Sequence, residues 1–239
     1  MTVASGPVIP NFGQASKCVE DNHLFCKSWV VDNWHGTLEP ALIQHVKLAA
    51  IAVGIGFAIA FVAALVAHRL RWAEPPFAFF SAFLYTIPSL ALFQLLVPFT
   101  GLTVTTVEIA LVGYTLLILF RNILAGLRGV PEDVLEAARG MGLTRAQTLL
   151  RVELPIALPA IVAGLRIAVV TTVSLATVAA FVVNEGLGKP IFVALRQEIF
   201  HTELIAAGGL AVALALVADV LLVGVQRLLT PWARAWRPA

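Results

Sequence analysis

Five long apolar runs, separated by short polar stretches, dominate the hydrophobic pattern of this 239-residue chain. A helix needs about 20 apolar residues to cross a bilayer core of roughly 30 Å. Lipid offers no hydrogen-bond partners to an open backbone, so each run is expected to be helical. The predicted spans cover residues 48–67, 77–99, 104–124, 160–183 and 204–226. The pattern predicts an all-α integral membrane protein with about five transmembrane helices.

The composition agrees with a chain that is embedded in lipid. Hydrophobic residues make up 59% of it and charged residues 13%, whereas soluble domains carry roughly 25% charge. Residues 1–10 lack the basic start and apolar run of a cleavable signal, so the spans themselves are expected to drive insertion. Two cysteines are too few for a disulfide framework of the whole fold.

The positions of the basic residues predict the orientation, because five spans place the two termini on opposite sides. One side then holds Arg69, Arg71, Arg121, Arg128, Arg139, Arg145, Arg151, Arg227, Arg234 and Arg237. The other side holds only Lys17, Lys27, Lys47, Lys189 and Arg196. Cytoplasmic loops carry an excess of Lys and Arg, so the N-terminus is expected outside and the C-terminus in the cytoplasm. The chain thus divides into an extracytoplasmic segment (residues 1–40), a transmembrane domain (41–230) and a cytoplasmic tail (231–239).

A polar helical segment, residues 130–155, lies between the third and fourth spans on the cytoplasmic side. Gly142 is expected to end its first helix, because glycine tolerates the backbone turn. Thr144, with Gln147 three residues on, has the spacing of a capping box that opens a second helix. Pro155 is expected to close that helix. The alternative is a loop that rests on the membrane surface, as basic amphipathic helices do.

Several residues of this segment recur at a spacing known from a transporter family. The residues are Glu136-Ala137-Ala138, Gly142 and Leu154-Pro155. Their spacing resembles the EAA loop of ABC-importer permeases, with Val152 at the position that usually holds Ile. Residues 86–91, 114–127, 136–142 and 152–159 are similar to the glycine betaine, choline and carnitine branch of that family. That branch has a glycine-rich run after the fourth span, of which residues 184–189 keep only the second half.

The resemblance implies the permease subunit of a type I ABC importer, which is itself no enzyme and needs no cofactor. It assigns ATPase coupling to Glu136, Ala137, Ala138, Gly142, Leu154 and Pro155. The implied partners are a second permease subunit (the same or a related chain), two cytoplasmic ATPase subunits, an extracytoplasmic solute-binding protein and membrane lipid. The implied location is the bacterial plasma membrane, and the implied cargo is a small compatible solute such as glycine betaine, choline or carnitine.

Other interpretations stay open, and some are excluded. The cargo of such an importer could instead be an amino acid or a thiol compound, and an ATP-independent channel or scaffold is an alternative of another class. Residues 186–189 read Gly-Leu-Gly-Lys, but Pro190 follows where a P-loop needs Ser or Thr. The five histidines show no metal-ligand spacing, and no grouping of Ser, His and Asp indicates covalent catalysis. The membrane topology explains the basic face, so nucleic-acid binding is not needed to account for it.

Polar side chains on three spans are the candidates to line a translocation pore. They are Ser81, Tyr85, Ser89 and Gln94 on the second span, Tyr114 and Thr115 on the third, and Thr171, Thr172 and Ser174 on the fourth. The alternative for each is ordinary hydrogen bonding between or within membrane helices.

Arg166 and Asp219 are the charges nearest to membrane depth, where ionised groups are costly and often functional. They lie at similar depth in the fourth and fifth spans, so an ion pair between them is one interpretation. Snorkelling of the Arg166 side chain to the interface is the other.

Cys18 and Cys26 lie in the segment expected outside the cell, where disulfides persist. We predict that they form a disulfide, which closes a short polar loop into a small cap over the outer end of the first span. The alternative is a disordered tail with two free thiols.

Overall fold

The computed structural model describes residues 16–196 and 199–231, and this part of the chain is helical with no strand. The elements are α1 (Lys17–Glu20), α2 (Lys27–Asp32), the π-helical η1 (Trp34–Leu38), α3 (Glu39–Arg69), η2 (Arg71–Ala73), α4 (Glu74–Thr86), α5 (Ser89–Thr100), α6 (Val104–Arg128), α7 (Glu132–Gly140), α8 (Arg145–Thr148), the π-helical η3 (Leu149–Glu153), α9 (Leu154–Ala179), α10 (Gly188–Arg196) and α11 (His201–Leu229). Among the described residues four helical stretches are long and apolar enough to span a membrane, and the number is five when one bent helix pair is counted as a single span. The predicted all-α membrane fold is confirmed.

The second predicted span, residues 77–99, is not one straight helix. It consists of α4 and α5, which meet at an angle of 102°. Pro88 lacks a backbone N–H and occupies the position before α5, with Ile87 in an extended conformation. A helix break at membrane depth leaves carbonyls without partners, which apolar surroundings penalise. The hydroxyl of Tyr114 donates to the Ile87 carbonyl oxygen over 2.5 Å and so compensates the break.

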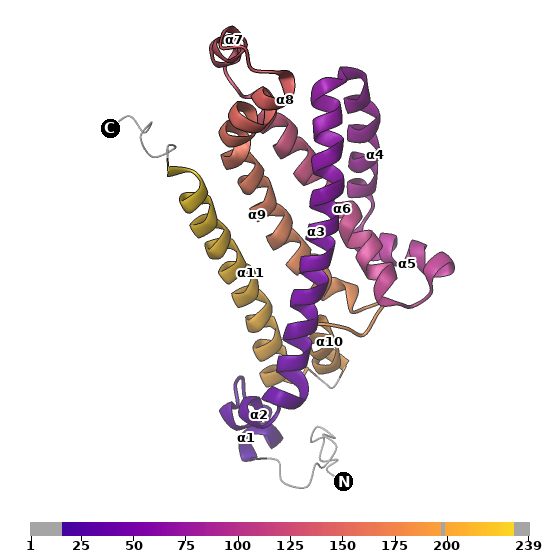
Figure 1. Cartoon of the computed structure of the whole chain (residues 1–239). Helices are drawn as coiled ribbons and strands as arrows, with labels where there is room; N and C mark the ends of the chain where they lie inside the picture. Colours follow the sequence, from indigo (N-terminus) through magenta and orange to yellow (C-terminus); the bar gives the residue numbers. More distant parts are fainter. Residues whose placement is uncertain (1–15, 197–198, 232–239) are drawn as a thin grey trace, which may run out of the picture.

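Helix α6 forms the centre of the fold and packs against both α3 and α9 (Figure 1). Small residues let these helices approach closely, as is common between membrane helices. Gly56 of α3 faces the side chain of Thr115, and Gly164 of α9 faces Asn122 of α6. A Cβ atom at Gly164 would lie 2.4 Å from the Cβ of Asn122, which leaves no room for any side chain there.

The two ends of the bundle carry different short elements (Figure 1). Helices α7 and α8 lie at the same end as the C-terminal part of α11. Helices α1, α2 and α10 lie at the opposite end, where α3 and α11 converge. The predicted tail, residues 231–239, lies outside the described residues except for position 231.

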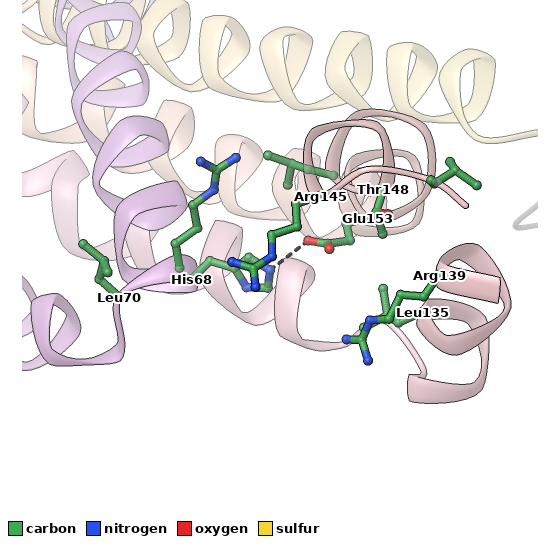
Figure 2. Close-up of a pocket in the computed structure, with 10 residues that line it drawn as sticks. His68, Leu70, Leu135, Arg139, Arg145, Thr148 and Glu153 are labelled. Atoms are coloured by element: carbon green, nitrogen blue, oxygen red, sulfur yellow. Dashed lines mark ion pairs between the residues drawn. The ribbon is translucent and has the colours of Figure 1, made fainter. Parts of the chain in front are cut away.

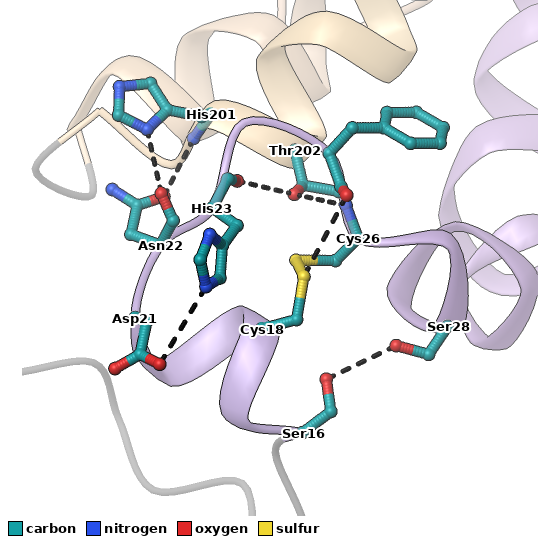
Figure 3. Close-up of a disulfide and its surroundings, with 10 residues drawn as sticks. Ser16, Cys18, Asp21, Asn22, His23, Cys26, Ser28, His201 and Thr202 are labelled. Carbon is teal, nitrogen blue, oxygen red and sulfur yellow. Dashed lines mark hydrogen bonds and ion pairs between the residues drawn. A yellow bond between two sulfur atoms is a disulfide. The ribbon is translucent and has the colours of Figure 1, made fainter.

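The end that carries α1 and α2 is closed by a cap, residues 16–38. A disulfide joins Cys18 to Cys26 within it. Figure 3 shows how the loop between the cysteines attaches to the start of α11. The Cys26 amide donates to Thr202 Oγ1 over 3.0 Å, and the His201 amide donates to Asn22 Oδ1 over 3.1 Å. The cap thus ties the N-terminal segment to α11, a connection between parts of the chain about 180 residues apart.

A second connection at this end joins α3 to the turn before α10. The Leu187 amide donates to Nδ1 of His45 over 3.2 Å, and the Gly186 amide donates to the side-chain oxygen of Gln44 over 2.9 Å. Because Nδ1 of His45 accepts, Nε2 carries the proton and donates to the Val173 carbonyl oxygen over 3.0 Å. The Gly-Leu-Gly-Lys stretch is therefore a structural turn held by a fully buried histidine.

Candidate coupling segment and translocation surface

The coupling segment, residues 130–155, begins with α7 and turns at a glycine corner. The Gly142 amide donates to the Arg139 carbonyl oxygen, and the Leu143 amide donates to that of Ala138. Gly142 has a φ of +78°, a left-handed conformation that favours glycine. Within the Glu-Ala-Ala triplet, Glu136 and Ala137 are exposed and Ala138 is buried. The triplet and the corner therefore form an exposed surface, and the buried Ala138 packs it against the rest of the protein.

The second half of the segment differs from the sequence-based expectation. Thr144 and Gln147 do form the predicted capping box at the start of α8. Pro155, however, does not close the second helix. It stands at the start of α9, directly after the π-helical η3, and the helical run passes through it. Helical structure therefore continues from α8 through η3 into α9, over Arg145–Ala179, and Leu154 and Pro155 belong to a membrane-spanning helix.

A contact between a carboxylate and a histidine joins this helical run to the end of α3. Glu153 of η3 lies 2.8 Å from Nε2 of His68, and both side chains are mostly buried. A nearby pair, Glu74 of α4 and Arg128 of α6, joins two further helix ends over 2.6 Å. Spacing along the chain indicates neither contact, since pairs so distant in sequence leave no periodic signal.

A cavity of about 560 Å³ lies between the end of α3 and the coupling segment. We call it the arginine pocket, because Arg69 of α3, Arg139 of α7 and Arg145 of α8 line it together with His68 and Glu153. In Figure 2 Arg145 lies close to the His68–Glu153 pair, and Arg139 extends from α7 on the other side of the opening.

The nine candidate pore residues separate into two groups. Ser81, Tyr114, Thr115 and Thr172 are at most 4% exposed. Their hydroxyl groups donate to backbone carbonyls of this chain, so within one chain they serve structure rather than a surface. The remaining side chains are accessible or half-buried: Tyr85, Ser89, Gln94, Thr171 and Ser174. Only this second group can line a passage in the present conformation.

Arg166 of α9 and Asp219 of α11 form a bidentate ion pair. Nε of Arg166 lies 2.7 Å from Oδ1 of Asp219, and Nη2 lies 3.0 Å from Oδ2. About one third of each side chain is exposed. A parallel fork of this kind fixes direction as well as distance, so the pair links α11 to α9 at membrane depth.

Removing either charge of this pair is expected to lower the folded yield more than removing both. An unpaired ion at membrane depth is costly, whereas the doubly neutral pair has no such penalty. The measurement compares Arg166→Gln, Asp219→Asn and the double variant by size-exclusion chromatography of detergent-solubilised protein. Additive losses would show that the two charges contribute independently.

Comparison with known proteins places this architecture in a family. Residues 41–235 match the family described as binding-protein-dependent transport system inner membrane component. The chain is 34% identical over 189 residues to the choline transport system permease protein OpuBB of Bacillus subtilis, covering 79% of this chain and 86% of that protein. It is 35% identical over 209 residues to the osmoprotectant import permease protein OsmW of Salmonella typhimurium, covering 85% and 96%.

A solved structure shares the fold. An inward-facing structure of the MetNI methionine ABC transporter superposes with a TM-score of 0.69 at 20% identity, covering 84% of this chain and 97% of that one. The family match spans the described helices from α3 to α11. This protein therefore belongs to the binding-protein-dependent transport system inner membrane components, which are multi-pass proteins of the bacterial plasma membrane.

Proposed function

We propose that this protein is the permease subunit of an ATP-driven importer for a small quaternary-ammonium or related compatible solute, such as choline, glycine betaine or carnitine. The coupling segment is the observation that carries this proposal. It projects from one end of the bundle and continues without interruption into the spanning helix α9. The relatives named for choline and osmoprotectant transport support the solute class.

The mechanism we infer is the transmission of movement from the coupling segment to the spans. Two cytoplasmic ATPase subunits would bind the coupling segment at Glu136, Ala137 and the Gly142 corner. Because α8, η3 and α9 form one helical run, displacement of the corner would tilt α9 directly. The Arg166–Asp219 pair would carry the tilt to α11, and the His68–Glu153 pair would carry it to α3. The spans would thereby alternate between inward- and outward-open states.

The remaining roles follow from the same proposal. The coupling segment faces the cytoplasm and the cap faces outward, as the positions of the arginines favour. A second permease subunit, identical or related, would cover the exposed side chains of Tyr85, Gln94 and Ser174. An extracytoplasmic binding protein would deliver the solute at the cap end and determine much of the selectivity.

ATP-dependent accumulation of solute tests this function directly. The complete assembly, with its ATPase and binding protein, would be reconstituted in proteoliposomes and given radiolabelled choline, glycine betaine or carnitine. We expect uptake against a gradient that requires ATP and the binding protein. Accumulation of an amino acid or a thiol compound in place of these solutes would reassign the cargo. Passive flux independent of ATP would contradict the importer and favour a channel.

A further inference from the structure

The arginine pocket carries more positive charge than its surroundings neutralise. Glu153, whose Oε2 lies 2.8 Å from Nε2 of His68, is the one carboxylate that lines it, against three arginines. Arg139 contacts Glu132 over 3.2 Å, but both side chains are about two-thirds exposed, and such surface pairs are weak. Among the described residues, Arg69 and Arg145 form no ion pair with a carboxylate of this chain. Guanidinium groups from three separate elements therefore line one cavity with charge left to neutralise.

The arginine side chains that line the pocket indicate which class of ligand it would bind. A guanidinium group presents a planar fork of donors that matches the oxygens of a phosphate. The cavity volume of about 560 Å³ is within the range of small-ligand sites, roughly 300–1,000 Å³. It has room for a phosphate group and its substituents.

The pocket also lies where phosphate groups are abundant. Arg69 is the last residue of the spanning helix α3, so the pocket is at the level where that span leaves the apolar core. Trp72 follows in η2 and is 74% exposed, and Trp is enriched at the membrane interface. Basic pockets at such positions between spanning helices can hold the head groups of anionic lipids.

We infer that the arginine pocket binds a phosphate-bearing anion, which bridges Arg69 of α3 to Arg139 and Arg145 of the coupling segment. The contact between His68 and Glu153 already connects α3 to this segment, and the anion adds a second connection. The position of α7 and α8 relative to α3 then depends on whether the anion is bound. This inference concerns binding alone and stands whether or not the chain transports the proposed solute.

Binding can be measured on the purified full chain in lipid nanodiscs. Three conditions separate the sources of phosphate: phosphatidylcholine alone, phosphatidylcholine with phosphatidylglycerol, and phosphatidylcholine with millimolar inorganic phosphate. Phosphatidylcholine bears a phosphate but no net charge, so it is the reference. The readouts are the thermal unfolding midpoint and the number of phosphatidylglycerol molecules retained in native mass spectrometry.

The pocket variant is Arg69→Gln with Arg145→Gln, and the control is Arg121→Gln with Arg151→Gln. Both remove two exposed arginines from the side of the membrane that is expected to be cytoplasmic, but only the first pair lines the cavity. We expect the anion to raise the unfolding midpoint of the wild type and of the control. The pocket variant should lose most of this rise and retain fewer phosphatidylglycerol molecules, because it lacks two of the three guanidinium groups that line the cavity. Arg145→Gln alone, an exposed single change, provides the same comparison if the double variant yields little protein.

Each outcome decides the inference. Stabilisation by phosphatidylglycerol alone identifies a lipid head group, and stabilisation by inorganic phosphate through the same arginines identifies a free anion. If neither anion binds, or if the pocket and control variants respond equally, the site does not exist. An equal response is what diffuse attraction of lipid to a basic surface would produce.

Discussion

Replacing Gly142 with valine is expected to reduce ATP-driven uptake at least about tenfold while the chain still inserts into the membrane. The left-handed conformation at Gly142 (φ +78°) costs a residue with a side chain roughly 1–2 kcal/mol, and more when it is β-branched. A Cβ atom added at this position would meet no atom within 4 Å, so the whole effect comes from the backbone. The backbone at position 142 would adopt other dihedral angles. Helices α7 and α8 would then meet at a different angle and would no longer fit the ATPase. A barrier increase of about 1.4 kcal/mol already corresponds to tenfold in rate.

The chain offers close controls for this prediction. Gly140 also has open space around it but does not have a positive φ, so Gly140→Val should retain much more uptake. Gly142→Asn should be intermediate, because asparagine tolerates the left-handed region. Glu136→Lys, which reverses the charge of an exposed residue, should abolish uptake by a different route. If Gly142→Val retained as much uptake as Gly140→Val retains, the corner conformation would not be required for transport.

Replacing Gly164 with alanine is expected to destabilise the helix bundle strongly. The added Cβ would lie 2.4 Å from the Cβ of Asn122, an atom bonded directly to the backbone, so no rotamer change relieves the contact. Helices α6 and α9 would have to separate, and overpacking of this kind typically costs about 1–3 kcal/mol. Thermal unfolding in detergent measures the effect.

The matched change is Gly208→Ala in α11, where no atom lies within 4 Å of the added carbon. Alanine favours a helix over glycine by about 1 kcal/mol, so this variant should be neutral or stabilised. If both substitutions gave the same midpoint, close contact between α6 and α9 would not limit the stability of the fold.

Much of the architecture was predictable because apolar length and capping chemistry are local signals. The spans follow from uninterrupted apolar runs, and Thr144 with Gln147 forms the expected capping box. The effects of the prolines were not predictable from such patterns. Pro88 breaks the second span and Pro155 is accommodated at the start of α9, because the outcome depends on whether the preceding carbonyls find other partners.

The candidate site was predictable only in outline. Spacing along the chain located the coupling segment, but it gave no information on contacts such as His68 with Glu153 or His45 with Leu187. Both are determined by tertiary packing between helices distant in sequence. The polar residues of the spans show the same limit. Tyr114 and Thr172 are polar residues of the kind that can line a pore. Each hydroxyl group nevertheless donates a hydrogen bond to a backbone carbonyl inside the chain.

Contact between the coupling segment and the ATPase is the central claim, and site-specific photo-crosslinking tests it most directly. A benzophenone amino acid would replace Met141, which is 73% exposed beside the glycine corner. In a matched chain it would replace Leu195, which is 45% exposed on α10 at the opposite end. Irradiation of the assembled transporter should give an adduct with the ATPase from position 141 and none from position 195. An adduct from position 195, or none from position 141, would contradict both the coupling role and the orientation.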